Sequence, residues 1–337
     1  MSNNAFSRRD FGKIMAASAA TFTAMPSITM AQQLTPIRVG YLHVLSVEAQ
    51  LFMGNHLGSW KRAGLDIQQR EFATGVDAFQ ALVGGSIDVL TCGGVLSNFP
   101  ARGQGKVFLL NNIESSVGQI WVHPNSGINS IADLKGKKIA TTRGTTAHNV
   151  LHQGLKSIGL DSRNDVQIVN QRMSDAVTAF ISGAVPAVAL WIPFNFSVRD
   201  KLPGARMLFS GAAYPEAAIA DGWAVRNDLL GENRDLLIKF IKGWIPANEY
   251  LINKPEESID YFHKNYYSHL SRNDVSEMFK ATAFYSTNEW VKYFQNGTAA
   301  KWLNLGTQFN IDIGAMQSPM MADKYFDPSI LLSAVKS

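Results

Sequence analysis

The chain has 337 residues, of which 46% are hydrophobic and 17% are charged, so it is long and apolar enough to bury a large core. This composition excludes a disordered regulator and makes two domains the default expectation. The formal charge is only +4 and no run of Lys or Arg occurs, which argues against a nucleic-acid channel or a polybasic membrane surface. The single cysteine, Cys92, excludes an internal disulfide, a zinc ribbon and an iron–sulfur cluster.

The first 31 residues have the pattern of an export signal. Residues 7–13 contain paired arginines, and residues 14–31 carry no charge and are rich in Ala, Ser and Thr. Paired arginines with Phe and Lys at this spacing resemble a twin-arginine signal, and small residues near Ala31 predict cleavage before Gln32. The alternative is an uncleaved anchor, which Pro26 and the mild hydrophobicity disfavour. We expect a mature chain of 306 residues carrying +2, exported to the periplasm by the twin-arginine route.

A second uncharged segment, residues 176–198, is also long enough to cross a membrane. Pro186 and Pro193 would interrupt a single helix there, at about 3 kcal/mol for each interior proline. We therefore expect a short helix, a turn, a buried strand and a loop in this segment.

The mature chain contains two segments with the same predicted order of strand, helix, strand, helix and strand. The predicted strands cover 37–41, 64–72 and 87–90 in the first segment, and 138–141, 166–169 and 185–190 in the second. The predicted helices between them cover 46–62, 77–82, 146–156 and 175–181. Such alternation with short links requires right-handed crossovers and parallel strands, so we expect two α/β lobes with parallel-dominated sheets.

The last third of the chain is predicted to be mostly helical. The expected helices cover 233–251, 255–264, 272–283 and 288–303, and a Ser286–Glu289 capping box opens the last of them. Parallel α/β sheets need helices on both faces, so this segment is expected to return to the first lobe. The resulting division places 35–118 and 222–337 in lobe I and 119–221 in lobe II.

Three short stretches of the second segment carry a family resemblance. They are Asp-Leu-Lys-Gly-Lys-Lys-Ile-Ala at 133–140, Arg-Gly-Thr-Thr-Ala-His-Asn at 143–149, and Gly-Ala-Val-Pro-Ala at 183–187 with Trp-Ile-Pro at 191–193. They resemble the periplasmic substrate-binding proteins of ABC transporters for aliphatic sulfonates and taurine, with their nitrate and thiamine-pyrimidine relatives. Pro186 departs from the family, which usually has Asp at that position.

The resemblance implies a type II periplasmic binding protein fold. Its two lobes carry helices on both faces of their sheets and close on one ligand molecule in a cleft between them. The implied partners are that ligand and an ABC permease in the inner membrane, and we expect a monomer.

Ligands of open α/β sheets lie beyond the carboxyl ends of the strands, and five predicted loops fall there. The loop at 143–146 combines a guanidinium, a glycine, two hydroxyls and a helix start, which together favour an anionic group. The alternative for this loop is an ordinary helix capped by threonine, with Arg143 in solvent. For Trp191 and Trp223 the alternative is packing in the core, and for His43 it is a half-exposed position in a loop. The candidate ligand-binding residues are His43, Leu45, Ser46, Thr74, Gly75, Gly93, Gly94, Val95, Arg143, Gly144, Thr145, Thr146, Trp191, Asp221 and Trp223.

These features predict a protein that binds a small organic anion, a sulfonate or a related carboxylate. Taurine would additionally need a carboxylate for its ammonium group, and Glu48, Glu114 and Asp221 lie near the predicted cleft edges. Alkanesulfonates, taurine, aromatic acids, nitrate and pyrimidines all remain open as ligands.

The alternative function is an enzyme on the same fold, either a desulfinase with Cys92 as nucleophile or a thiamine-pyrimidine-related enzyme. Cys92 lies beside Gly93 at the end of a predicted strand, where a nucleophile can be placed, but small buried cysteines are more often structural. His148 and His152 lack a third ligand, so we expect no metal, and we expect no cofactor and no nucleic acid.

Overall fold

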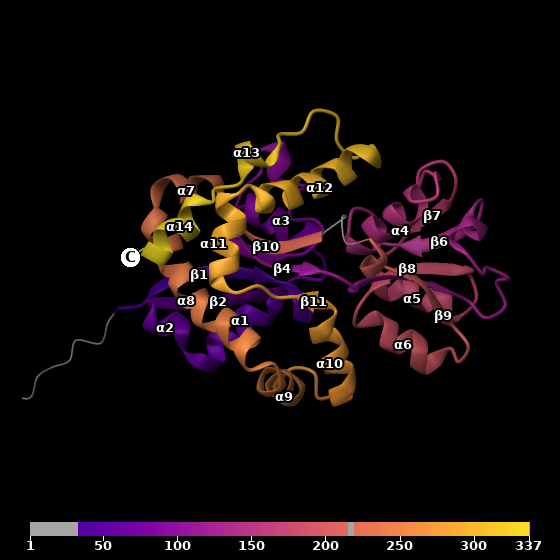
Figure 1. The fold of residues 1–337 in the computed structure, drawn as a ribbon, viewed down its shortest axis with the longest axis horizontal. Helices are drawn as coiled ribbons and strands as arrows, with labels where there is room; N and C mark the ends of the chain where they lie inside the picture. The colour runs from indigo at the N-terminus through magenta and orange to yellow at the C-terminus, as the bar shows by residue number, and fades with distance from the viewer. Residues whose placement is uncertain (1–32, 215–218, 337) are drawn as a thin grey trace, which may run out of the picture. The chain divides into compact units, whose positions relative to one another are not determined.

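The structure, a computed structural model, describes residues 33–214 and 219–336, so the predicted export signal lies outside the described residues. The described strands form two sheets (Figure 1). The first sheet has the order β11-β4-β10-β3-β1-β2. Its strands are β1 (Thr35–Tyr41), β2 (Leu65–Glu71), β3 (Val89–Cys92), β4 (Lys106–Glu114), β10 (Ile219–Val225) and β11 (Thr282–Ala283).

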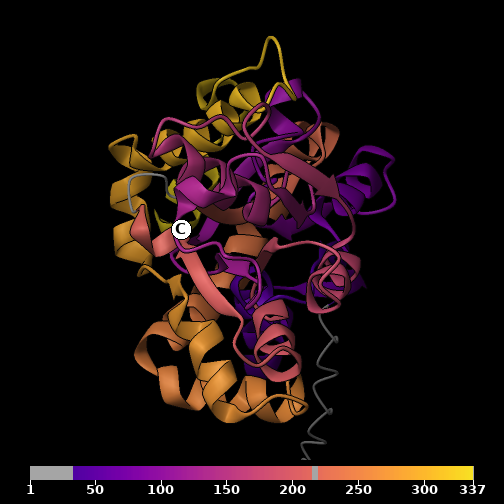
Figure 2. The same ribbon diagram turned by 90° about the vertical axis from the view of Figure 1, so that its right-hand side faces the viewer.

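The second sheet repeats this arrangement and faces the viewer in Figure 2. Its order is β7-β6-β8-β5-β9. The strands are β5 (Gly118–Val122), β6 (Lys138–Thr141), β7 (Gln167–Asn170), β8 (Ala187–Trp191) and β9 (Arg206–Ser210). All six strands of the two predicted α/β segments are therefore present, and in each sheet the first strand of the segment lies between the other two.

Both sheets are more mixed than the parallel-dominated sheets that we predicted. β1 pairs in parallel with β2 and β3, and β6 pairs in parallel with β7 and β8. By contrast, β10 is antiparallel to β3 and β4, and β5 is antiparallel to β8 and β9. The antiparallel strands lie next to the points where the chain passes from one sheet to the other, and the α/β pattern contains no signal for them.

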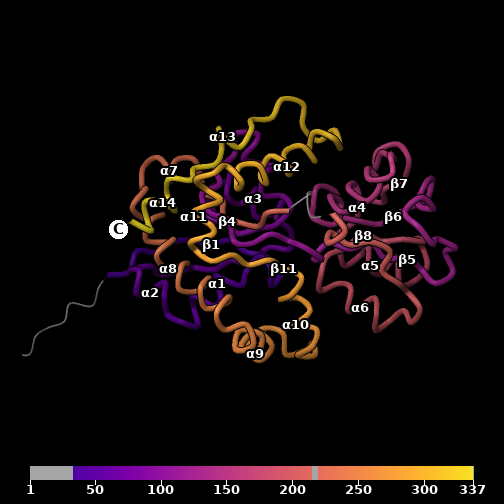
Figure 3. The backbone as a smooth tube through the Cα atoms, viewed as in Figure 1, coloured from indigo at the N-terminus to yellow at the C-terminus, as the bar shows by residue number. Residues whose placement is uncertain are grey.

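The chain passes between the sheets after β4 and again between β9 and β10, and Figure 3 traces the backbone along the first passage. Backbone N–H groups of Ser115 and Ser116 in this passage donate to the carbonyl of Ala281. β10 begins at Ile219, within the range that we expected for lobe II, because three further residues pair with β4. Both sheets belong to one compact unit, Leu34–Ser337.

The four helices predicted within the two α/β segments are present, with two corrections. The helices of this part of the chain are α1 (Leu45–Leu57), α2 (Ser59–Arg62), α3 (Gly75–Val83), α4 (Thr146–Lys156), α5 (Met173–Ile181) and α6 (Phe194–Lys201), with short 3-10 turns at Pro100–Arg102, Ile131–Leu134 and Gly211–Ala213. The helix predicted at 46–62 is divided at Gly58, whose φ of 65° is left-handed, and a helix at Phe194–Lys201 stands where we expected a loop. The hydroxyl of Thr74 caps α3 by accepting from the Asp77 N–H. The uncharged segment 176–198 is divided between α5, β8 and α6. In the part of the chain that the structure describes, no helix is long and apolar enough to span a membrane.

The C-terminal region is helical as predicted, with two corrections. Its helices are α7 (Asn227–Glu232), α8 (Arg234–Asn253), α9 (Pro255–Asn265), α10 (Arg272–Lys280), α11 (Thr287–Gln295), α12 (Thr298–Asp312), α13 (Ala322–Tyr325) and α14 (Ser329–Lys336). The helix expected at 272–283 ends at Lys280, because Thr282 and Ala283 pair with β4 as strand β11. The predicted Ser286–Glu289 capping box is present. The single helix expected at 288–303 is wrong, because Gly297 adopts a left-handed φ of 82° and separates α11 from α12.

These C-terminal helices cover the first sheet and its helices. α8 packs on α1, α2 and α14, and α12 packs on β10. Trp60, Trp223 and Phe240 meet in the core beneath them, with ring centroids 4.7–4.8 Å from Phe240. This dense aromatic core fixes the first sheet as a rigid support for the loops at its strand ends.

Candidate functional site

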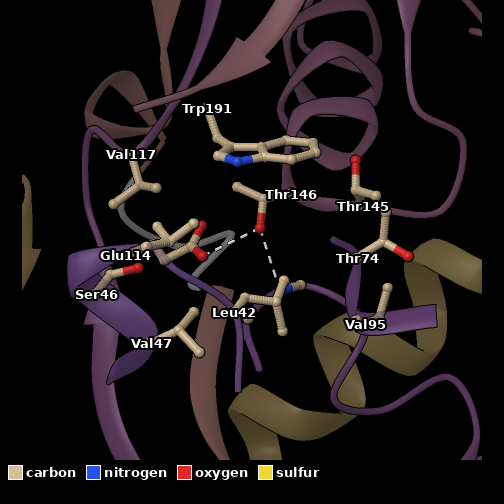
Figure 4. Close-up of a pocket in the computed structure, with 14 residues that line it drawn as sticks. Leu42, Ser46, Val47, Thr74, Val95, Glu114, Val117, Thr145, Thr146 and Trp191 are labelled. Atoms are coloured by element: carbon tan, nitrogen blue, oxygen red, sulfur yellow. Dashed lines mark hydrogen bonds between the residues drawn. The ribbon is translucent and has the colours of Figure 1, made fainter. Parts of the chain in front are cut away.

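A pocket lies where strand ends from the two sheets meet (Figure 4). It holds about 430 Å³ of empty space, part of which opens to solvent. The lining residues come from the β1–α1 loop and α1, the β2–α3 and β3 loops, the end of β4 with the following passage, the start of α4 and the end of β8. They are Leu42, Val44, Ser46, Val47, Thr74, Gly75, Gly93, Gly94, Val95, Glu114, Val117, Thr145, Thr146 and Trp191.

Nine of the fifteen sequence-predicted site residues line this pocket. They are Ser46, Thr74, Gly75, Gly93, Gly94, Val95, Thr145, Thr146 and Trp191. Sequence reasoning missed the apolar members, Leu42, Val44, Val47 and Val117, and noted Glu114 only as a carboxylate near a cleft edge. The first three follow directly from the strand-end rule, because they lie in the same loop and helix start as Ser46.

Three predicted site residues pack within the first sheet's side of the molecule. Leu45 and Trp223 are completely buried in the core, and the indole N–H of Trp223 donates to Asn111 Oδ1. The imidazole of His43 stacks on Tyr267 at 4.8 Å and contacts Glu48 Oε2 through Nδ1 at 3.0 Å. None of these three side chains lines the pocket; beside His43 and Leu45, the neighbouring Val44 and Ser46 face it instead.

Arg143 and Gly144 line a neighbouring cavity together with Arg102 and His148. The backbone N–H of Gly144 donates to His148 Nδ1 at 3.1 Å, so the loop folds back onto α4. The Arg143 side chain is exposed. The structure therefore does not bring the predicted anion-binding arginine to the main pocket.

Thr146 joins the two sides of the pocket through its hydroxyl. The hydroxyl donates to Glu114 Oε1 at 3.0 Å and accepts from the Gly94 N–H at 3.1 Å, as the dashed lines in Figure 4 mark. Glu114 and Gly94 belong to the first sheet and its loops, whereas Thr146 begins α4 of the second. A Cβ atom on Gly94 would lie 2.7 Å from the Thr146 backbone nitrogen, so the close approach requires glycine here.

Glu114 and Asp221 form a pair of buried carboxyl groups beside Gly93. A Cβ atom on Gly93 would lie 2.6 Å from Glu114 Oε1 and 2.8 Å from Asp221 Oδ1, which places both carboxyls around one point. Burial raises the pKa of Glu114 to about 7. Burial and the neighbouring Glu114 raise the pKa of Asp221 well above its ordinary value. Two carboxyls in one dry site cannot both ionise readily, so the pair shares a proton at neutral pH.

The charge of the pocket is otherwise low. Of the described residues that line it, only Glu114 is ionisable, and neither lysine nor arginine contributes. The first turn of α4 adds partial positive charge through its backbone N–H groups. Among the described side chains none caps this turn, because the hydroxyl of the N-cap residue Thr145 donates to the Thr142 carbonyl instead. The pocket therefore combines apolar walls, with Trp191 on one side, with the start of α4, which favours an anion, and with the carboxyl of Glu114, which Asp221 approaches from behind.

Cys92 lies next to this pair but has no access to the pocket. It is completely buried, and burial together with Asp221 and Glu114 raises the pKa of its thiol well above the ordinary value. A nucleophilic cysteine needs the thiolate form and an electropositive surrounding, which this environment opposes. Among residues 33–214 and 219–336, no group of three or more metal-ligating side chains is arranged to hold a metal ion.

Replacing Glu114 by glutamine is expected to change how stability depends on pH. Between about 4.5 and about 7, native Glu114 keeps a proton that the unfolded chain releases, so its contribution to the free energy of unfolding falls as the pH rises. His148 acts in the opposite direction, because its pKa is lowered to about 4 and the unfolded chain binds the extra proton. The measurement is therefore the difference in melting temperature between wild type and Glu114→Gln from about pH 5 to about pH 7. Both proteins contain His148, so its contribution cancels in this difference. The wild type should lose stability relative to the variant across this range; a constant difference would contradict the raised pKa.

Known proteins resemble this chain both in sequence and in structure. Residues 46–258 match the model of the family described as NMT1/THI5 like. The chain belongs to the NMT1/THI5-like family. This match confirms the resemblance stated above, since relatives in the same comparisons are periplasmic solute-binding proteins.

Two relatives of this NMT1/THI5-like protein match most of its length. A binding protein of Brucella abortus is 27% identical over 305 residues, which cover 90% of this chain and 93% of the relative. An ABC transporter periplasmic binding protein of Brachyspira hyodysenteriae is 25% identical and covers 86% and 85% of the two chains.

Solved structures share the fold at lower identity. The alkanesulfonate-binding protein SsuA from Xanthomonas axonopodis pv. citri, bound to MOPS, has a TM-score of 0.65 at 21% identity and covers 87% of this chain and 98% of its own. The desulfurization enzyme DszB has a TM-score of 0.66 at 16% identity and covers 89% and 99%. These likenesses establish the periplasmic binding protein fold, which both binders and an enzyme adopt.

Proposed function

We propose that this protein captures one small organic anion, a sulfonate or a related carboxylate, in the pocket and delivers it to an ABC importer in the inner membrane. The observation that carries the proposal is that both sheets line a single pocket and meet there through Thr146. A ligand that contacts both sides binds the closed arrangement more tightly than an open one, so its binding drives closure. A permease then distinguishes the loaded protein from the empty one by its shape.

The anionic group of the ligand is proposed to lie at the start of α4. Unpaired N–H groups at a helix start and the helix dipole favour a sulfonate or carboxylate without help from an arginine. Trp191, Val95 and Val117 then contact the apolar part of the ligand. The nine predicted residues that line the pocket are the proposed ligand contacts. The same proposal includes export by the twin-arginine route, location in the periplasm and a monomeric state.

A thermal-shift panel tests this function with alkanesulfonates, aromatic sulfonates, carboxylates, nitrate and pyrimidines. A ligand present at about 100 times its Kd adds about 2.7 kcal/mol to the stability of the native state, so one acid should raise the melting temperature by ~5 °C or more. Calorimetry on that acid should give one site per chain. A response confined to nitrate or to uncharged pyrimidines would overturn the organic-anion proposal.

The same panel separates the enzyme alternative from the binding function. Incubation with aromatic sulfinates should release no sulfite, because the Cys92 thiol is buried and protonated. Sulfite release that disappears in Cys92→Ser would favour the desulfinase reading.

A further inference from the structure

A second contact joins the two sides of the molecule away from the pocket, along one face of α4. His148, His152 and Lys156 are spaced four residues apart, so they lie on the same face of this helix. This face meets the last turn of α12, the helix that reaches towards α4 in Figure 1. α4 packs on β5 and β8 of the second sheet, whereas α12 packs on β10 of the first. None of the three α4 residues lines the pocket.

Asp312, the last residue of α12, is the acceptor at the centre of this contact. His152 Nε2 lies 3.2 Å and Lys156 Nζ lies 2.7 Å from Asp312 Oδ2. Gln308, on α12 itself, donates to Asp312 Oδ1 at 2.7 Å. Although burial opposes ionisation, these three donors hold the pKa of Asp312 below its ordinary value. Asp312 is therefore a carboxylate at neutral pH, and two of its three donors come from the helix on the second sheet.

The imidazole of His152 takes part in this contact as a neutral ring. Burial lowers its pKa, so the ring carries no charge at neutral pH. A carboxylate can only accept, so Nε2 carries the proton and donates to Asp312. Nδ1 then accepts from the hydroxyl of Ser162, which lies 3.1 Å away. Both ring nitrogens are therefore bonded, and the positive charge opposite Asp312 comes from Lys156.

Phe309 adds an apolar part to the same contact. The centroid of its ring lies 5.3 Å from that of His148 and 5.7 Å from that of His152. The three side chains belong to residues that are 5% exposed or less, so moving α4 away from α12 would bring part of their surface into water. Burial and hydrogen bonds that exist in only one arrangement favour that arrangement. The contact therefore stabilises the closed arrangement of the two sheets whether or not a ligand is bound.

We propose that this contact is a clasp that keeps a substantial fraction of the protein closed and sets ligand affinity from outside the pocket. The clasp consists of His148, His152 and Lys156 of α4 with Phe309 and Asp312 of α12. The inference rests on the proposed function, because it concerns the closure on which that function depends. A ligand that binds the closed form gains apparent affinity in proportion to the fraction of protein that is closed. The clasp raises the affinity for every ligand by the same factor and contributes nothing to the choice among them.

Small-angle scattering of the protein without added ligand tests the clasp directly. Asp312→Ala removes the shared acceptor and should give a larger radius of gyration than wild type, because fewer molecules are closed. The matched control is Glu257→Gln, which breaks an exposed ion pair with Lys254 at the junction of α8 and α9. This control should keep the wild-type radius. Equal radii for Asp312→Ala and wild type, with folding checked by circular dichroism, would overturn the inference.

Calorimetry with butanesulfonate, toluenesulfonate and benzoate measures the effect on affinity. Asp312→Ala should weaken the binding of each acid that wild type binds by about fivefold, the size expected for a partly exposed ion pair with an added hydrogen bond. The factor should be the same for all of these acids, because the clasp touches no ligand. A factor that differs more than threefold between two acids would show that Asp312 acts on the ligand, which contradicts the clasp.

A double-mutant cycle assigns the effect to the contact between the two helices. Lys156→Ala should weaken binding by about twofold in the wild-type background and not at all when Asp312 is already alanine. Equal losses in both backgrounds would mean that the two residues do not act as a pair, and the clasp would fail. Lys156 is 56% exposed, so Lys156→Ala also repeats the scattering comparison if Asp312→Ala does not fold.

The outcomes separate this inference from the proposed function. If none of the three acids binds wild type at millimolar concentration, the organic-anion function fails for them, while scattering without ligand still decides the clasp. If the acids bind and Asp312→Ala changes neither the radius nor the affinity, the proposed function stands and the clasp is wrong.

Discussion

Replacing Gly94 by alanine is expected to weaken ligand binding by about 100-fold, or about 2.7 kcal/mol, while the protein still folds. The added Cβ atom would lie 2.7 Å from the backbone nitrogen of Thr146 and 2.9 Å from its Cα atom. These are backbone atoms at the start of α4, so no side-chain rotation relieves the clash. Moving α4 away from Gly94 relieves it and breaks the two hydrogen bonds of Thr146. The substitution therefore penalises the closed arrangement selectively.

The control for this prediction is Gly231→Ala. Gly231 lies in α7, a Cβ atom there meets nothing within 4 Å, and its φ is not in the left-handed region. It should leave affinity within about twofold, because a surface substitution of this kind changes little. Small-angle scattering with saturating ligand should show a larger radius of gyration for Gly94→Ala than for wild type or Gly231→Ala. Unchanged affinity in Gly94→Ala would mean that ligand binding does not require the contact between Gly94 and Thr146.

The sequence predicted the elements whose signals are local. Each of the two α/β segments alternates short apolar strands with helices, and the Ser286–Glu289 capping box marks the start of α11. The antiparallel strands β4 and β10 are long and almost completely buried, yet polar residues such as Asn111 and Asp221 interrupt their apolar pattern. Their pairing joins residues that lie 105 to 119 positions apart in the sequence, as the pairs Ile219 with Glu114 and Val225 with Lys106 show, and hydrophobic periodicity carries no information about such a distant partner.

The site was predictable to the extent that it follows from topology. Loops at the carboxyl ends of parallel strands must gather at one edge of a sheet, and this rule placed Ser46, Thr74, Gly93 and Thr146 at the pocket. The direction of one side chain within a loop follows no such rule. Arg143 is exposed, and the neighbouring Gly144 N–H binds His148. The partnership of Glu114 with Asp221 likewise depends on how β10 adds to the sheet beside β4.

Replacing Asn111 by alanine is expected to lower the free energy of unfolding by about 3–5 kcal/mol. Asn111 is completely buried on β4, and its Oδ1 accepts from the indole N–H groups of Trp223 and Trp244, the latter at 2.9 Å. Its amide also donates to Thr91 Oγ1 at 2.9 Å. Alanine would leave two indole donors unpaired, at about 1–3 kcal/mol each, and would create a small cavity.

Urea denaturation of wild type, Asn111→Ala and the exposed control Asn125→Ala measures this loss. The control should stay within about 0.5 kcal/mol of wild type. A loss below about 1 kcal/mol in Asn111→Ala would contradict the role assigned to its carbonyl oxygen.

The same substitution connects the core to the pocket. The Asn111 amide and the Thr91 hydroxyl both donate to the carbonyl of Val47, a residue that lines the pocket. Gln50 on α1 also donates to the backbone carbonyl of Asn111, a bond that alanine would keep. Asn111 therefore holds the first turns of α1 against β4, next to the carboxyl pair. Asn111→Ala should weaken ligand binding as well as stability, at temperatures well below its own unfolding transition, because the carbonyl of the pocket residue Val47 loses one of its two side-chain donors.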